Sequence, residues 1–202
     1  SWVQTFEQVV RDYGVRSPDT GAHGNSLTLR VTRTANVRTE TFYDAADAGN
    51  VSSVQSLAGL EAGSILELTQ AGQDGSTVSA IRMPFKIDTA RQKIVWSDDF
   101  AGSGFDPSMP IRLTSVEFDI SIYGDGKLLQ GFSALSPNPG HSRAFAKLLP
   151  ASCRTVDFSP RVLDAANLEI SRGEAAAYLA TVDWTLENTW PPEGDYVLGG
   201  GV

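Results

Sequence analysis

The chain has 202 residues, a formal net charge of −8 and a hydrophobic fraction of 41%, enough apolar material for one large domain or two small ones. Nucleic acid and anionic membranes attract concentrated Lys and Arg, so the acidic balance disfavours both as partners. The sequence lacks an apolar run of about eighteen residues and a basic-then-apolar N-terminus, so it predicts neither a membrane-spanning helix nor a signal peptide.

The first elements expected are a helix and a strand. Apolar residues recur at three- and four-residue steps over residues 1–13, which predicts a short helix. Gly14 and Pro18 end it, because neither residue continues a helix well. Strict alternation then predicts a strand at 26–34 with one buried face. That face carries Leu27, Leu29 and Val31.

Residues 36–47 are polar and give no clear prediction, whereas residues 50–100 carry a series of short strand signals. Strands are expected from Val51 to Val54, over residues 65–68, near 77–87 and over 93–97. Short turn segments separate them, among them Gln73-Asp74-Gly75-Ser76 and Asp88-Thr89-Ala90. Five short strands with tight connections in about fifty residues favour a small barrel-like lobe or a rolled sheet.

After a Gly-, Ser- and Pro-rich loop at 101–110, the strongest hairpin signal lies at 113–133. Its first strand alternates apolar and polar residues, and Gly124-Asp125-Gly126 supplies the turn. A short amphipathic helix is expected at 142–149. The C-terminal signals are weaker: a strand at 154–158, a helix around 174–179 and a polar, Pro-containing stretch from 187 to 194.

These elements predict a mainly β (α+β) fold with antiparallel sheets, short flanking helices and an inserted barrel-like subdomain. The strands at 26–34 and 113–133 share the same alternation and are expected to pair in one sheet. Residues 1–49 and 101–202 would then form one discontinuous domain around a lobe at 50–100. The start at Ser1 without Met and the end at Gly-Gly-Gly-Val suggest a piece of a longer protein.

Catalytic arrangements are not expected in this sequence. A serine nucleophile of the Gly-x-Ser-x-Gly type is absent, and Ser142, beside His141, is interpreted as a helix cap. Asp98 and Asp99 are neighbours whose side chains diverge, so they are interpreted as solvated loop acids rather than a glycosidase pair. Gly102-Ser103-Gly104 lacks the strand, helix and third glycine of a dinucleotide loop.

Metal and cofactor sites are not expected either. Cys153 is the single cysteine, which excludes an internal disulfide, and it is interpreted as a small core residue. With only His23 and His141 besides, a zinc ligand set is not available. The turns around Asp74 and Asp125 each offer one carboxylate, too few for calcium. We therefore expect no enzyme activity, no cofactor and no metal.

The remaining candidates are cationic and aromatic. Arg30, Arg33 and Arg38 lack neighbouring aromatic residues in sequence and are interpreted as a solvated strand face. Trp96 lies in a strand pattern and is expected in the core. Trp184 and Trp190 are expected to pack, but with the 101–110 loop they motivate an alternative function: an outward-facing carbohydrate or cell-surface binding module.

Three segments resemble the contractile tail sheath family of phages and related injection machines. The first is the turn and strand opening at 17–31, Ser-Pro-Asp-Thr-Gly-Ala-His-Gly-Asn-Ser-Leu-Thr-Leu-Arg-Val. It looks like the family's turn, but His23 stands where the family commonly has Trp and is read as a packing position. The second is the hairpin 116–132 with Ser133-Ala134-Leu135-Ser136-Pro137, and the third is 196–202, similar to the segment that leads into a Gly-Gly-x-Asp-Gly motif. Residues 54–96 also resemble a small β-domain inserted in some sheath-like proteins. The positions that carry the motifs are Gly21, Gly24, Asn25, Gly124, Gly126, Phe132, Gly199 and Gly200.

The resemblance implies a structural role. Sheath protomers stack as rings around a tail tube, store energy in an extended state and contract to drive the tube through an envelope. This chain would be a surface-exposed middle domain of such a protein. Its partners would be other copies of the full-length protein, the tube and the baseplate, with no nucleic acid and no membrane insertion. It would be located in the virion tail of a phage or prophage, or in the bacterial cytoplasm within a contractile injection system.

Overall fold

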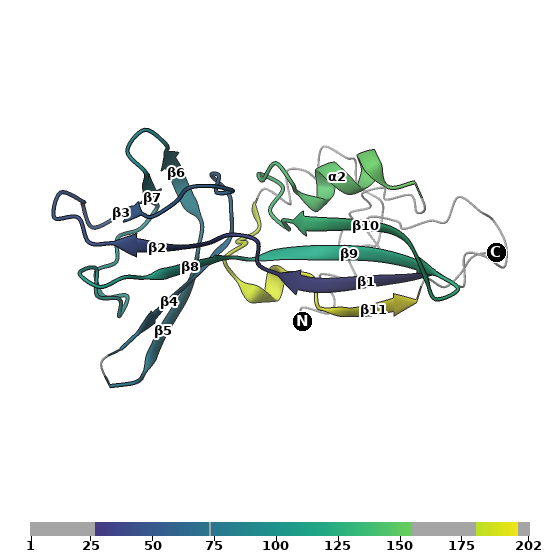
Figure 1. Cartoon of the computed structure of the whole chain (residues 1–202), viewed down its shortest axis with the longest axis horizontal. Coiled ribbons are helices and arrows are strands. Elements are labelled where there is room, and N and C mark those ends of the chain that lie inside the picture. The colour runs from purple at the N-terminus through teal and green to yellow at the C-terminus, as the bar shows by residue number, and fades with distance from the viewer. Residues whose placement is uncertain (1–26, 73, 155–180, 198–202) are drawn as a thin grey trace. The chain divides into compact units, whose positions relative to one another are not determined.

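A computed structural model describes residues 27–72, 74–154 and 181–197 (Figure 1). The expected mainly β class with antiparallel sheets is confirmed. The expected helices at 1–13 and 174–179, and the strand at 154–158 apart from its first residue, lie outside the described residues. No helix within the described ranges is long and apolar enough to cross a membrane.

The chain divides into two compact units: residues 1–33 with 118–202, and residues 34–117. The first contains a four-stranded sheet in the order β10-β9-β1-β11. The strand at 26–34 and the hairpin therefore do share one sheet, as expected. The apolar faces of that strand and of the hairpin's first strand are buried, whereas Leu128 and Leu129 on the second strand are 60% and 51% exposed. The strands are β1 (Leu27–Thr34), β9 (Glu117–Gly124), β10 (Lys127–Leu135) and β11 (Gly194–Val197).

The β9–β10 hairpin closes at the predicted turn. Gly124 pairs with Lys127, and between them Asp125 and Gly126 have φ angles of 50° and 73°, the left-handed values of a two-residue hairpin turn. A Cβ on Gly124 would lie 2.8 Å from a methyl carbon of Leu129, but that side chain is 51% exposed and can move aside. Of the two glycines, Gly126 is therefore the one that the backbone conformation of the turn favours.

One helix, α2 (Phe145–Ser152), packs beside β10 (Figure 1). It begins three residues after the predicted start, and its N-cap residue is Ala144 without a side-chain cap bond. The interpretation of Ser142 as the cap was therefore wrong. His141 instead orders the preceding turn, since its Nδ1 accepts the Arg143 amide at 3.1 Å and its carbonyl accepts the Lys147 ammonium at 2.9 Å.

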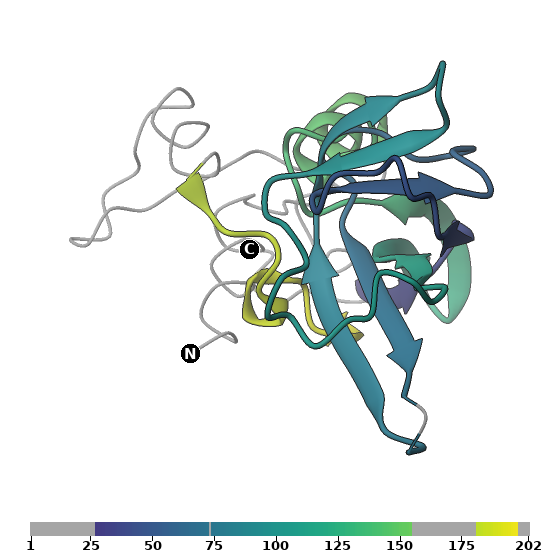
Figure 2. The same cartoon turned by 90° about the vertical axis from the view of Figure 1, so that its left-hand side faces the viewer.

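The second unit contains a seven-stranded sheet in the order β5-β4-β8-β2-β3-β7-β6. Its two ends run in clearly different directions (Figure 2), and the order ends at β5 and β6, so the described strands form an open sheet and not a closed barrel. The strands are β2 (Arg38–Phe42), β3 (Val51–Val54), β4 (Leu66–Ala71), β5 (Thr77–Arg82), β6 (Pro84–Asp88), β7 (Lys93–Trp96) and β8 (Arg112–Ser115).

The boundaries of this unit differ from the predicted lobe at 50–100, because β2 and β8 belong to its sheet. β2 pairs with β3 on one side and β8 on the other. It gave no strand signal because its buried face carries Thr39 and Thr41, which are 5% and 6% exposed, rather than apolar residues. The region near 77–87 contains two strands, β5 and β6, so the described part of 50–100 carries five strands, as expected.

Aromatic packing dominates the core of the seven-stranded unit. Phe100 stacks edge-on against both Trp96 and Phe105, each with ring centroids 5.9 Å apart, an arrangement that adds roughly 1 kcal/mol per pair to simple burial. Trp96 is 1% exposed, as expected of a core residue, and its Nε1 donates to Ser52 Oγ at 2.9 Å. The buried cluster consists of Val54, Leu66, Leu68, Ile94, Trp96, Phe100, Phe105, Ile111 and Leu113.

Candidate functional site

A pocket of about 410 Å³ lies between two loops of the seven-stranded unit. One wall is the 43–49 loop with the end of β2, and the other is the 100–107 loop. Buried apolar residues, Phe100, Phe105 and Ile111, line it, and so do two exposed aromatic residues. These are Phe42 and Tyr43, which are 47% and 61% exposed.

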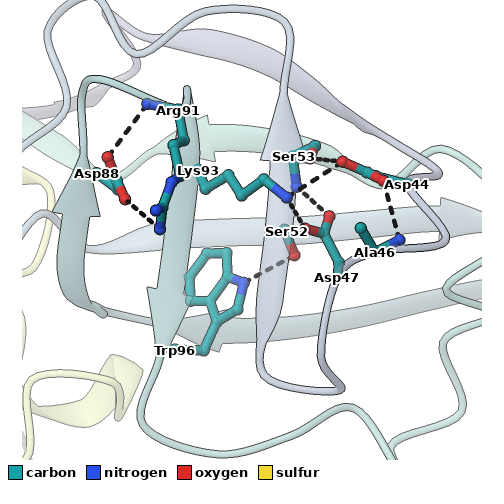
Figure 3. Close-up of polar contacts among 9 residues, drawn as sticks. All are labelled: Asp44, Ala46, Asp47, Ser52, Ser53, Asp88, Arg91, Lys93 and Trp96. Atoms are coloured by element: carbon teal, nitrogen blue, oxygen red, sulfur yellow. Dashed lines mark hydrogen bonds and ion pairs between the residues drawn. The ribbon is translucent and has the colours of Figure 1, made fainter.

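An ion-pair cluster fixes the 43–49 loop. Lys93 extends from β7 past β3 toward the carboxylates of Asp44 and Asp47 (Figure 3). Its Nζ lies 3.1 Å from Asp44 Oδ2 and also donates to Asp47 Oδ1. Asp47 Oδ2 accepts the Ser53 amide at 2.9 Å, so the cluster ties the loop to β3 as well as to β7.

The same contacts shift two ionisation equilibria. Hydrogen bonds from the Ala46 amide and then from the Lys93 ammonium hold the pKa of the Asp44 carboxyl below its ordinary value. Hydrogen bonds to Asp47 and Asp44, in that order, raise the pKa of Lys93. Lys93 therefore stays a cation and Asp44 an anion across neutral pH.

A buried amide fixes the opposite wall. Gln70, on β4, is 6% exposed, and its Nε2 donates to the carbonyls of Asp106 at 2.9 Å and Met109 at 3.2 Å. Its Oε1 accepts the Asp106 amide at 2.8 Å. The loop that the sequence marks only as Gly-, Ser- and Pro-rich is thus held from inside the sheet.

The Trp residues proposed for a sugar platform do not form one. Trp184 and Trp190 are 6% and 4% exposed, and Trp190 Nε1 donates to the Trp184 carbonyl at 2.8 Å. The Trp190 ring packs against Phe118 and the Arg33 guanidinium lies 5.0 Å from its centroid. Both indoles pack, as expected. The sequence analysis missed Phe42 and Tyr43, although two adjacent aromatic residues within the polar stretch 36–47 were a signal that could have been used.

The arginines of β1 have aromatic neighbours that the local sequence does not reveal. Arg30 lies 4.9 Å from the Tyr123 ring centroid and forms two hydrogen bonds to Asp195, of 2.6 and 2.8 Å. Asp195 raises the pKa of Arg30, and Arg30 lowers the pKa of the Asp195 carboxyl. These residues fasten β11 to β1 on an exposed face.

The remaining residues considered in the sequence analysis, Cys153, Asp98 and Asp99, make contacts that are explained by the fold. Cys153 is half-buried, not in the core, and its Sγ lies 3.5 Å from Gln130 Oε1. Asp98 and Asp99 are exposed, and their carbonyls accept hydrogen bonds from Arg82. Within the described ranges no group of three or more His, Cys, Asp or Glu side chains is placed to hold a metal.

Only three of the family-motif positions lie within the described residues. Gly124 and Gly126 form the hairpin turn, and Phe132 on β10 pairs with Ile120 on β9. The other motif positions and His23 lie outside the described residues: Gly21, Gly24, Asn25, Gly199 and Gly200. The structure therefore brings none of the described motif positions into the pocket.

Comparison with known proteins finds no family model, no curated protein and no solved structure that matches this chain.

Proposed function

We propose that this chain is a structural, non-catalytic component of a contractile tail sheath-like protein. It would be a surface-exposed domain of a protein that polymerises around a tail tube and contracts to drive the tube through an envelope. Its partners would be further copies of the full-length protein, the tube and the baseplate, in a virion tail or a bacterial contractile injection system.

The observation that carries this proposal is the way the 34–117 unit is inserted. The chain enters the unit after β1 and returns into β9, and β1 and β9 are neighbours in the four-stranded sheet. An insertion at such a point leaves the host sheet continuous. Such an insertion is compatible with lattice contacts made by the host domain of a sheath-like protein.

Polar contacts hold the entry and exit of the unit together. Ser115 Oγ accepts the amides of Asn36 and Val37 at 3.0 and 2.9 Å, and the Asn36 side chain donates to Glu117. The buried Ser115 and Glu117 are satisfied in this way, which fixes the two ends of the unit to each other. A unit closed at its own ends can move as one body, as a rigid-body rearrangement requires.

Electron microscopy of the full-length protein that contains this chain tests the proposal. The folded protein is expected to form tubes or stacked rings. A protein that is folded by circular dichroism but remains as dispersed particles, under all conditions that polymerise sheaths, would contradict it.

The alternative, an outward-facing carbohydrate or cell-surface binding module, loses the Trp pair that motivated it, because both indoles are buried. The 101–110 loop still supports that alternative, because part of it lines the pocket together with Phe42 and Tyr43. In this alternative the pocket would be the binding site.

A further inference from the structure

The pocket between the 43–49 and 100–107 loops is lined by exposed aromatic side chains that do not belong to the buried core of the unit. Phe42 and Tyr43 lie in sequence at the end of β2, and both rings are about half exposed or more. An aromatic side chain that is about half exposed contributes less to folding than a buried one, because much of its apolar area stays in water. Both residues line the pocket together with buried Phe100 and Phe105, and an aromatic ring is a surface on which a flat apolar ligand face can stack.

Both walls are held before any ligand arrives. Lys93 fixes the 43–49 loop through Asp44 and Asp47, and Gln70 fixes the opposite loop through the backbone of Asp106 and Met109. Preformed walls lower the ordering cost of binding. The volume of about 410 Å³ lies within the range of small-molecule sites.

The charges around the pocket select the ligand class. Two carboxylates, Asp44 and Asp47, face the Lys93 ammonium, and the Arg82 guanidinium lies 4.5 Å from the ring centroid of Phe100, which lines the pocket. These charges balance, so the pocket offers no excess charge for an ionic ligand and favours a neutral one. The Asp44 side chain is 34% exposed, so its oxygens can accept hydrogen bonds from a neutral ligand that carries hydroxyl groups.

The Tyr43 hydroxyl adds a group that can both donate and accept. Within the described residues it makes no hydrogen bond with the protein. A ligand with hydroxyl groups around a flat apolar face would form hydrogen bonds with the Tyr43 hydroxyl and the Asp44 carboxylate and stack on the aromatic rings. A neutral hexose or N-acetylhexosamine ring has that chemistry.

We propose that this pocket binds one or two rings of a neutral saccharide, stacked on Phe42 and Tyr43. The proposal is independent of the sheath-like role, because it concerns the 34–117 unit alone. Loss of sugar binding and failure to polymerise would be separate results.

The test is a titration of the isotope-labelled chain by two-dimensional NMR with three neutral disaccharides: N,N′-diacetylchitobiose, maltose and cellobiose. At least one is expected to shift the amide signals of residues 42–49 and 100–107. Tyr43→Ala is expected to weaken that binding about tenfold, the size of one lost aromatic contact. Tyr43→Phe separates the contribution of the hydroxyl from that of the ring.

Phe85→Ala is the matched control, because Phe85 on β6 is 72% exposed and does not line the pocket. It should leave binding unchanged. The proposal is overturned if none of the three disaccharides shifts these signals, or if Phe85→Ala weakens binding as much as Tyr43→Ala. Choline chloride causing the same shifts while the disaccharides cause none would also overturn it, and would indicate a cation site.

Discussion

The two sheets of this chain are held together in different ways. The four-stranded sheet relies on strict alternation, with Leu29, Phe118 and Ile122 each at most 1% exposed. The seven-stranded sheet combines an aromatic cluster with polar anchors, among them Gln70 and Lys93, that reach from strands into loops. Alternation of apolar and polar residues specifies a sheet from local sequence. Polar side chains such as Gln70 and Lys93, in contrast, determine where the long loops lie.

The largest loss of stability is expected when a buried tryptophan is replaced by alanine. Trp96→Ala and Trp190→Ala each remove a buried ring and a hydrogen-bond donor, and each should cost about 3–5 kcal/mol of unfolding free energy. Trp96→Ala should speed amide exchange in β4 and β8, and Trp190→Ala in β1 and β9. Hydrogen exchange with mass spectrometry reads both units at once. If either variant lowered the protection of amides from exchange equally in both units, the two sheets would not be held together independently.

A smaller effect is expected at the pocket wall. Gln70→Ala removes the hydrogen bonds to the backbone of residues 106–110 and leaves those groups unsatisfied, at a cost of about 2 kcal/mol. Gln55→Ala is the control, because Gln55 is exposed and should change stability by less than about 0.5 kcal/mol. Chemical denaturation measures both. Similar stability of the two variants would mean that the loop does not depend on Gln70.

Lys93→Met should loosen the 43–49 loop, because Asp44 and Asp47 then face each other without a cation. The pKa of Asp44 is lowered, so its contribution to stability is complete above its unfolded value of about 3.9 and is lost as the pH falls through the folded value. The pKa of Lys93 is raised, so its contribution is complete below about 10.4 and is lost as the pH rises through the folded value.

The stability difference between wild type and Lys93→Met should therefore be constant from about pH 5 to about pH 9 and shrink at either extreme. Thermal unfolding over a pH series measures it. A difference that grows toward low pH would contradict the ion-pair explanation.

The smallest effect is expected on the exposed face of the four-stranded sheet. Asp195→Asn removes the charge that pairs with Arg30, where both side chains are about half exposed, and surface pairs contribute little. β11 should exchange slightly faster at about 0.01 M salt, and the difference from wild type should vanish near 1 M. An effect that is independent of salt would point to packing and not to charge.

The same contrast explains what could be predicted from the sequence. The alternation around Leu29 and Ile120, and the turn at Asp125 and Gly126, were sufficient for one sheet and its hairpin. β11 was missed because it has four residues and is placed by Arg30, 165 positions away in the chain. No local pattern carries such a contact.

The pocket was missed for the same reason. Its walls are separated by about fifty residues in sequence, and the groups that fix them, Gln70 and Lys93, lie on other strands. The Trp residues drew attention because of their type, yet their size favours burial as much as binding. Exposure of Phe42 and Tyr43 depends on where β2 ends, which the polar sequence of 36–47 does not specify.

The central claim is that residues 34–117 form a surface insertion in a sheath-like structural protein. The most direct measurement is electron microscopy of the full-length protein with residues 35–116 replaced by a two-residue Asn-Gly turn, which can join adjacent antiparallel strands. Tubes of smaller outer diameter than the wild type are predicted. A variant that keeps a folded four-stranded sheet yet forms no tubes, while the wild type does, would contradict the claim.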